Sequence, residues 1–292
     1  MQNTSHSKKS YILLISSMTI MGTIGLFRRY IPFSSALLAF FRGLIGALSL
    51  CLFLLFRGEK GTQRPSQSKL LGLILNGAFL GLNWILLFEA YNYTTIATAT
   101  LCYYTQPTIV LLLAPFVFGE KLTVKKLLCA LGAIIGMVFL SGVTIYGSND
   151  LSGILFGLAA AVFYALVVIL NKKLGSVDVY ERTIVQLFSA SLVLVPYLLF
   201  TEDITSLAFT PQVILLLLVV GVVHTGVVYA MYFGSISALK AQTISVLSYI
   251  DPVVALFISV LILREPFSVR SMLGAVLILA SAIISELPEH RK

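Results

Sequence analysis

Four ionisable side chains stand inside long apolar runs of this sequence, namely Arg42, Glu89, His224 and Asp251. A charge at bilayer depth is costly, so residues of this kind mark substrate, ion or proton pathways by default. Asp251 lies about ten residues into its run, which corresponds to roughly 15 Å of helix and places it near the bilayer midplane. There it could recognise an ammonium group or exchange protons; alternatively, it caps a kinked backbone or pairs with Arg42.

The other three ionisable residues each have a functional and a structural interpretation. Glu89 is either a gating or coupling carboxylate or the partner of an arginine. For Arg42 a structural role, pairing with Glu89 or capping carbonyl groups, is favoured over a fork that binds a substrate carboxylate. For His224 a hydrogen-bonded structural role is favoured over a proton shuttle, because that is the commoner role of a lone histidine in an apolar helix.

Aromatic and amide side chains deep in the same runs offer a surface for a small organic ligand. Their apolar bodies and polar tips suit such a ligand, whereas tyrosines near run ends would form an interfacial belt. Together with Asp251, the candidate substrate-binding residues are Asn83, Trp84, Tyr104, Gln106, Tyr164 and Tyr229. The sequence has no metal-ligand spacing, phosphate-binding glycine loop or nucleophile motif, so we expect no metal, cofactor or catalytic residue and disfavour a membrane-embedded enzyme.

The elements that must position these residues are the apolar runs themselves. Of 292 residues, 58% are hydrophobic and 11% are charged, against about 25% charged in soluble proteins. Runs of about 20 nearly uncharged residues match the thickness of a bilayer. Ten such runs predict an all-α integral membrane protein with ten transmembrane helices in a lipid bilayer, at 11–27, 34–56, 70–92, 96–118, 126–146, 152–171, 183–200, 211–236, 242–263 and 269–286.

The distribution of Lys and Arg predicts how the chain sits in the membrane. With the N-terminus in the cytoplasm, most of the 20 basic residues fall in segments on the cytoplasmic side of the membrane. Arg28, Arg29, Arg264 and Arg270 fall in segments on the outer side. This asymmetry predicts a multi-pass protein of the inner or plasma membrane with both termini cytoplasmic. It also accounts for the net charge of +8, which therefore does not indicate nucleic acid as a partner.

The chain also repeats a pattern at an offset of 145 residues. Tyr104 corresponds to Tyr249, Pro107 to Pro252 and Glu120 to Glu265. Five runs separate equivalent positions, so the second copy enters from the opposite side, and inverted repeats of this kind are the architecture of many secondary transporters. Each proline removes a backbone donor and predicts a helix kink. The copies differ at one informative position, where Gln106 corresponds to Asp251.

Together these features resemble the EamA type of the drug/metabolite transporter superfamily. The resemblance rests on five plus five runs, on the apolar–Pro–Glu pattern repeated in the fourth and ninth runs, on the basic segment 57–69 and on Arg42. It implies two inverted five-helix repeats, 11–147 and 148–287, around a central cavity. Cytoplasmic tails are then expected at 1–10 and 288–292.

The resemblance also implies a function. It implies a secondary active transporter that moves small organic metabolites by alternating access, through export or exchange of amino acids or related amphipathic compounds. The alternative within the same fold is an importer of a vitamin- or nucleoside-like metabolite. Protons are the candidate coupling ion, and a monomer and a homodimer both remain open.

Overall fold

The structure, a computed structural model, describes residues 2–28, 30–57, 65–94, 96–141, 150–175, 177–203, 207–236, 238–262 and 269–287. Every regular element in these ranges is a helix. The elements are α1 (Gln2–Gly22), α2 (Ile24–Arg28), α3 (Ser35–Arg57), α4 (Gln67–Tyr93), α5 (Ile96–Tyr103), α6 (Gln106–Phe118), α7 (Val124–Ser141), α8 (Asp150–Lys173), α9 (Val179–Thr201), α10 (Pro211–Val219), the π-helical segment η2 (Val220–Val227), α11 (Val228–Ile236), α12 (Ala241–Leu247), α13 (Ile250–Leu261) and α14 (Val269–Glu286). The predicted repeat residue Glu265 lies outside the described residues.

Several of these helices are long and apolar enough to cross a membrane. Within the described ranges there are six, judged by length and composition: Lys8–Phe27, Ser35–Phe56, Gln67–Tyr93, Leu151–Lys173, Val179–Thr201 and Pro211–Ile236. Three predicted spans are divided rather than continuous, because 11–27 is split into α1 and α2, 96–118 into α5 and α6, and 242–263 into α12 and α13. The chain is therefore an all-helical, multi-pass membrane protein, and the count of ten crossings stays a prediction.

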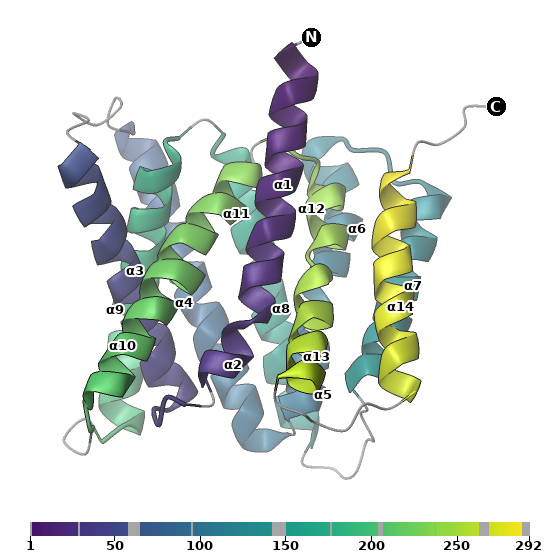
Figure 1. The fold of residues 1–292 in the computed structure, drawn as a ribbon. Helices are drawn as coiled ribbons and strands as arrows, with labels where there is room; N and C mark the ends of the chain where they lie inside the picture. Colours follow the sequence, from purple (N-terminus) through teal and green to yellow (C-terminus); the bar gives the residue numbers. More distant parts are fainter. Residues whose placement is uncertain are drawn as a thin grey trace.

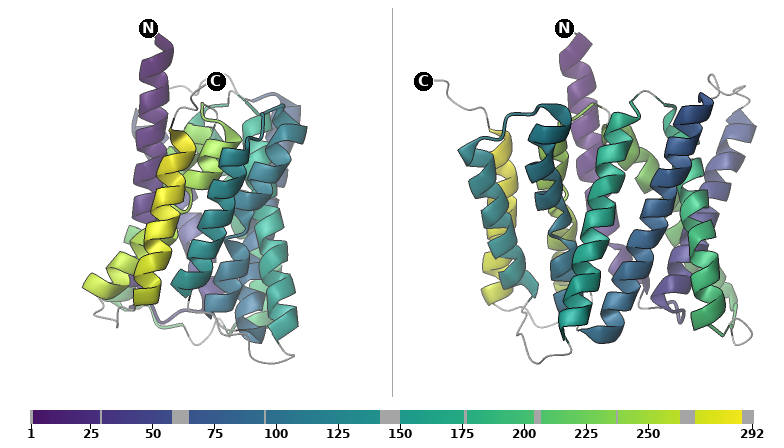
Figure 2. Two further views of the ribbon diagram at one scale, coloured as in Figure 1. Left: turned by 90° about the vertical axis from the view of Figure 1, so that its right-hand side faces the viewer. Right: turned by 180° about the vertical axis from the view of Figure 1, so that it is seen from behind.

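The helices stand side by side in one bundle, as Figure 1 and Figure 2 show. On one lateral side of the bundle α3 packs against α9, and on the other lateral side α7 packs against α14. In the middle, α4 contacts both α8 and α9, and α1 lies against α11 and α13. α6 packs against α12, so the broken helices α5–α6 and α12–α13 lie against each other within the bundle.

Small residues bring the helices of this bundle into close contact. A Cβ atom added to Gly77 of α4 would lie 2.5 Å from the Gln186 carbonyl of α9. One added to Gly136 of α7 would lie 2.8 Å from the Gly274 carbonyl of α14. Helix association in a membrane depends on such close backbone approach, because lipid provides no hydrophobic drive between helices.

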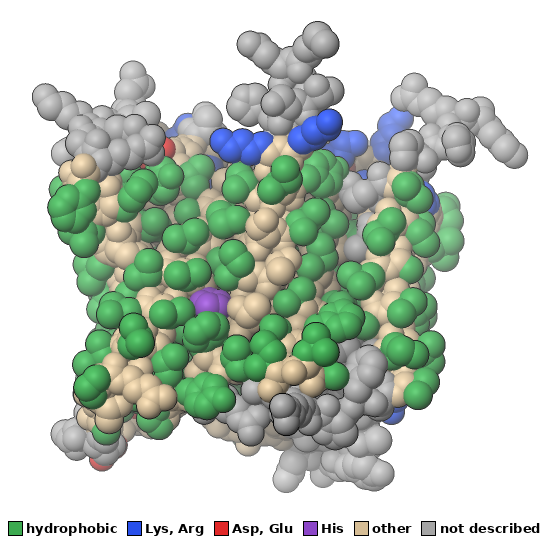
Figure 3. Space-filling model, viewed as in Figure 1, with side chains coloured by type: hydrophobic (Ala, Val, Ile, Leu, Met, Phe, Trp, Pro, Cys, Tyr) green, Lys and Arg blue, Asp and Glu red, His purple; other side chains and the backbone are tan. Residues whose placement is uncertain are grey.

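The two ends of the bundle differ in charge. Figure 3 shows Lys and Arg side chains gathered around the end at which α1 begins, with hydrophobic side chains covering the middle. We call this end the N-terminal face and the other end the opposite face. The described lysines at the ends of α6, α8 and α11, or at the starts of α4 and α7, all belong to the N-terminal face. Arg270, at the start of α14, lies on the opposite face.

Candidate functional site

The two prolines of the repeated pattern lie just after helix breaks. Pro107 occupies the first turn of α6, which follows the interruption at residues 104–105. Pro252 occupies the first turn of α13, which follows the interruption at residues 248–249. In a first turn the missing proline N–H has no intrahelical acceptor to lose, so proline is tolerated there. The sequence predicts a kink at each proline. In the structure a new helix begins one residue before Pro107 and two residues before Pro252.

The two breaks face each other and are joined by side-chain hydrogen bonds. The Tyr104 hydroxyl donates to Oδ2 of Asp251 at 2.9 Å. The hydroxyls of Thr108 and Tyr249 are 3.1 Å apart. Asp251 itself lies in the first turn of α13, where the helix dipole favours a negative charge. The structure thus brings together two of the predicted binding residues, Tyr104 and Asp251.

Aromatic rings surround this contact. The Tyr103 ring lies 5.6 Å from that of Tyr104 and 5.8 Å from that of Tyr164. Tyr229, which is 2% exposed, packs edge-on against Phe233. Such rings provide apolar walls with polar tips, which is the lining expected for a small organic ligand.

One of these polar tips is unused. The Tyr232 hydroxyl is buried and has no hydrogen-bond partner of good geometry in the described part of the chain, although Tyr164 and Ser248 lie beside it. A buried polar atom of this kind normally has a partner, so this hydroxyl is available to a polar group that enters the aromatic cluster.

Arg42 places a positive charge beside two of the aromatic residues of this region, Trp84 and Tyr229. Its guanidinium carbon lies 4.8 Å from the centre of the Trp84 ring, a cation–π distance, and the Trp84 indole lies beside the Tyr229 hydroxyl. The buried Nε of Arg42 finds no hydrogen-bond partner among the described residues. In the described ranges no ion pair joins Arg42 to Glu89 or to Asp251, and the role of Arg42 stays a prediction.

Two predicted binding residues, Asn83 and Gln106, lie apart from the hydrogen bond at Asp251. Asn83 is fully buried and its amide donates to the Ala160 carbonyl at 2.7 Å, so it ties α4 to α8. Gln106 is 4% exposed at the start of α6. Within the part of the chain that the structure describes, no hydrogen bond joins Gln106 to Asp251. The two corresponding residues are therefore not hydrogen-bonded to each other in this conformation.

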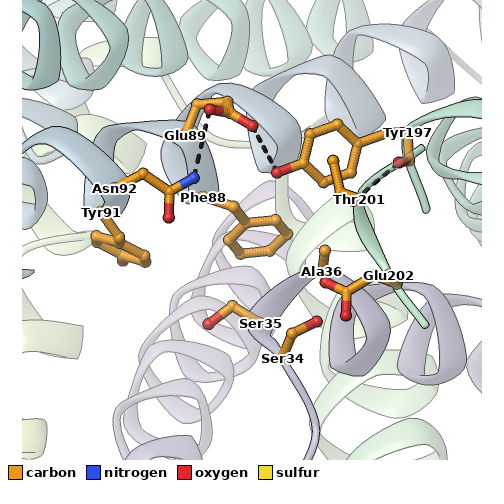
Figure 4. A pocket seen from close by; sticks show the side chains of 10 residues that line it. All are labelled: Ser34, Ser35, Ala36, Phe88, Glu89, Tyr91, Asn92, Tyr197, Thr201 and Glu202. Atoms are coloured by element: carbon orange, nitrogen blue, oxygen red, sulfur yellow. Dashed lines mark hydrogen bonds between the residues drawn. The ribbon is translucent and has the colours of Figure 1, made fainter. Parts of the chain in front are cut away.

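Glu89 lies in a pocket on the opposite face, shown in Figure 4. The Tyr197 hydroxyl donates to one carboxylate oxygen at 2.6 Å and the Asn92 amide to the other at 3.4 Å. The pocket has a volume of about 250 Å³ and lies between the start of α3 and the ends of α4 and α9. Its lining residues are Ser34, Ser35, Ala36, Phe88, Glu89, Tyr91, Asn92, Tyr197, Thr201 and Glu202.

Tyr91 connects this pocket to the central cluster. It lines the pocket, and its hydroxyl is close enough to Arg42 and Tyr104 to interact with both electrostatically. The pocket and the cluster around Asp251 are therefore neighbours along α4 rather than separate features.

His224 is positioned by an irregular stretch of helix. It lies in η2, and π-helical segments occur frequently at functional sites. Its Nε2 is 2.9 Å from the hydroxyl of Thr23, the residue between α1 and α2, and its ring packs edge-on against Phe27. Its buried Nδ1 lies near the Val219 backbone but makes no hydrogen bond of good geometry within the described ranges. These contacts tie η2 to the bend between α1 and α2.

Sequence reasoning missed one buried charge. Arg182 is 1% exposed, and its guanidinium donates to the carbonyls of Asn171, Phe233 and Gly175. The predicted run began at residue 183, whereas α9 begins at Val179. The signal that could have placed the start is Asp178, whose carboxylate caps α9 by accepting from the N–H groups of Tyr180 and Glu181.

Known proteins share this sequence pattern. The model of the EamA-like transporter family matches residues 8–142 and again residues 151–287. The "Uncharacterized transporter YxxF" of Bacillus subtilis is 30% identical over 281 residues, which cover 94% of this chain and 88% of the relative. "Protein PecM" of Dickeya dadantii is 26% identical over 265 residues, which cover 88% of this chain and 84% of the relative.

The fold is shared as well. A solved crystal structure superimposes with a TM-score of 0.83 at 18% sequence identity, over 95% of this chain and 97% of that chain. At that identity the likeness concerns the fold alone. The family match, in contrast, extends over both halves of the sequence and includes the broken helices. The chain therefore belongs to the EamA-like transporter family, within the drug/metabolite transporter superfamily.

Proposed function

We propose that this EamA-like protein is a secondary active transporter that moves amino acids or related amphipathic molecules by export or exchange. Its pathway runs between two inverted five-helix halves, which open alternately to the two sides of the membrane. The observation that carries the proposal is the hydrogen bond from Tyr104 to Asp251, formed where two broken helices face each other. Transporters with inverted repeats typically bind substrate at such discontinuous helices near the bilayer midplane.

The helix boundaries support a duplication. An offset of 145 residues maps α7 onto α14 end to end, and maps α3 onto α9 to within one residue. It also maps Ile96, the first residue of α5, onto Ala241, the first residue of α12. If α1–α2, α5–α6, α10–η2–α11 and α12–α13 each cross the membrane once, the chain has ten crossings, five in each half.

The packing of equivalent helices supports their inversion. The Lys125 ammonium, at the start of α7, donates to the Leu287 carbonyl just after the end of α14. Further along the same pair, Gly132 faces Ser281. The two equivalent helices thus run in opposite directions, as an inverted repeat requires.

The charges around the aromatic cluster favour a zwitterionic substrate. Tyr229 is close enough to both Arg42 and Asp251 to interact electrostatically with each. A guanidinium on one side and a carboxylate on the other complement the carboxylate and ammonium groups of an amino acid. The Nε of Arg42, which has no hydrogen-bond partner in the described residues, and the Tyr232 hydroxyl, which has only poorly aligned neighbours in Tyr164 and Ser248, are additional polar groups for such a ligand.

Orientation and coupling complete the proposal. The lysines of the N-terminal face favour a cytoplasmic location for that face, so the Glu89 pocket would open to the outside. Asp251 can hold either a proton or a substrate ammonium group, but not both with full affinity. Competition of this kind at one carboxylate would couple substrate movement to protons.

The test is flux through the purified protein in proteoliposomes. Labelled amino acids, together with vitamin- and nucleoside-like compounds, are offered with and without a pH gradient of either sign. We expect flux of one or more zwitterions that depends on the gradient and is lost in Asp251→Asn. Asp203→Asn, the same change in the exposed loop after α9, is the matched control.

Several results would contradict the proposal. Gradient-dependent flux that persists in Asp251→Asn would remove the coupling role of Asp251. Preference for a nucleoside- or vitamin-like compound, accumulated inward, would replace export by import. Absence of flux for every compound would contradict transport of this substrate class.

A further inference from the structure

We propose that Glu120 fastens the N-terminal face of the transporter shut by joining its two halves, and that opening to this face requires its release. The inference rests on the proposed alternating access and adds a residue that lies outside the binding region. Gly119 ends α6 in the left-handed conformation, with φ 65°, and its N–H donates to the Pro115 carbonyl. This turn directs the Glu120 side chain to the start of α12.

The carboxylate of Glu120 makes contacts on both of its oxygens. One oxygen accepts from the N–H of Ala241 at 3.0 Å, and the other from the N–H of Gln242 at 3.4 Å. The Lys172 ammonium, at the end of α8, lies 3.4 Å from the first oxygen. N–H groups in the first turn of a helix have no intrahelical acceptor, and a negative charge is favoured there. We refer to Glu120, Lys172 and the backbone N–H groups of Ala241 and Gln242 as the Glu120 latch.

A second set of contacts reinforces the latch. The Lys126 ammonium donates to the Gln242 side-chain oxygen at 2.7 Å, and the Gln242 amide donates to the Lys121 carbonyl at 3.3 Å. Lys172 also donates to the Leu239 carbonyl at 2.5 Å. Residues 120–126 lie in the first family match, and residues 172–242 in the second. Every contact made by Glu120, Lys121 or Lys126 therefore crosses between the two halves of the chain, whereas the bond from Lys172 to Leu239 lies within the second half.

Burial makes the latch stronger than an ordinary surface ion pair. The side chains of Lys172 and Glu120 are only 17% and 11% exposed. Exposed ion pairs contribute little because water and salt screen them. Charged hydrogen bonds that are shielded from water are considerably stronger. The latch can thus hold the two halves together, and the entry of water would release it.

The latch lies at the N-terminal-face end of the contact between α6 and α12. α6 packs against α12, and the seam between their halves also contains the contacts Thr108–Tyr249 and Tyr104–Asp251. α6 is about 20 Å long at the rise of an α-helix, so the seam extends from Asp251 to the N-terminal face. A closed latch would keep α6 and α12 together and so block a route from Asp251 to that face between them.

The test measures opening without any substrate. Cys51, Cys102 and Cys129 are replaced by alanine, and Ser245→Cys is introduced as a reporter in α12, where Ser245 is 2% exposed. A water-soluble thiol reagent is applied to the protein in nanodiscs. We expect Glu120→Gln to raise the labelling rate about tenfold, because a charged hydrogen-bond acceptor is lost. Glu202→Gln, the same change on the opposite face, is the control and should leave the rate unchanged.

A second variant keeps the proposal open to contradiction if Glu120→Gln does not fold. Lys172→Met leaves the Glu120 carboxylate bound to the N–H groups of α12 but removes its ion pair. We therefore expect a smaller rise in the labelling rate than for Glu120→Gln. Unchanged labelling in both folded variants, or an equal rise in Glu202→Gln, overturns the latch. These outcomes are separate from the flux assay: increased labelling without flux would keep the latch and contradict transport, whereas normal flux with unchanged labelling would contradict the latch alone.

Discussion

The two faces of the bundle treat their carboxylates in different ways. At the N-terminal face, Glu120 is held by a lysine and by backbone N–H groups of the other half of the chain. At the opposite face, Glu89 accepts from the hydroxyl of Tyr197 and the amide of Asn92 among the described residues, and it lines a pocket of about 250 Å³. In the described residues the carboxylate at the N-terminal face, which we propose is the closed face, is thus held by an ion pair, whereas the carboxylate in the pocket of the opposite face accepts from neutral donors.

On the proposed inverted repeat, this difference means that two similar halves can still produce two unlike faces. Inverted halves would give each face the same helices in mirrored order, so a difference between the faces must come from side chains or from conformation. Glu89 corresponds to Gly234 in the second half at the offset of 145 residues, so the pocket carboxylate has no counterpart there. The following predictions probe the closed face first and then the open one.

The largest expected effect is on stability at the closed face. Arg182→Met would remove the buried guanidinium that satisfies three carbonyls, so we expect the free energy of unfolding to fall by about 3 kcal/mol. Unfolding by SDS titration measures the loss. Arg270→Met, at the exposed start of α14, is the control and should cost less than about 1 kcal/mol. Equal stability of Arg182→Met and the parent protein would show that these carbonyls do not need the arginine.

Accessibility provides the next largest effect. Thr201→Cys lines the pocket at an exposed position, whereas Ser245→Cys lies beneath the Glu120 latch. In the alanine-substituted background, we expect a water-soluble thiol reagent to label Thr201→Cys about 100-fold faster, since a buried thiol reacts only after local opening. Similar rates at the two positions would mean that the faces do not differ in access, and the comparison would fail.

The sequence predicted the elements better than their boundaries. Apolar runs and the offset of 145 residues located the helices, because hydrophobic length is a strong constraint in a membrane. The breaks before Pro107 and Pro252 were expected only as kinks, since a proline disfavours the preceding helical turn without specifying how much backbone is released. Arg182 was missed because the estimated start of its run was four residues late.

The candidate site was predicted in part. Asp251 and Tyr104 were identified from depth and residue type, and the structure joins them. Pairing could not be predicted: Arg42 packs on Trp84 rather than on a carboxylate, and Asn83 bonds to Ala160 on another helix. Such contacts depend on how helices rotate about their axes, which packing decides and hydropathy does not. The latch residue Glu120 was visible as a repeat position, but its partners come from distant segments.

A smaller effect is expected at the turn that directs Glu120. Gly119 adopts φ 65°, and among the described residues nothing lies within 4 Å of an added Cβ. Gly119→Ala therefore tests backbone conformation alone and should cost about 1 kcal/mol. We expect labelling of Ser245→Cys to rise less than in Glu120→Gln. Gly25→Ala, where an added Cβ likewise meets nothing within 4 Å in the described structure, is the control without positive φ. A labelling rate unaffected by Gly119→Ala would separate the turn from the latch.

The smallest effect is expected from the open face, and it sharpens the comparison most. Tyr197→Phe removes one donor to Glu89 at a side chain that is only partly buried. Water in the pocket can replace the lost donor, so the free energy of unfolding should change by less than about 1 kcal/mol. Labelling of Ser245→Cys should stay unchanged, because no contact of the Glu120 latch is altered. If Tyr197→Phe instead increased that labelling, the two faces would be coupled through α4 and α9, and the closed face would depend on more than its own charges.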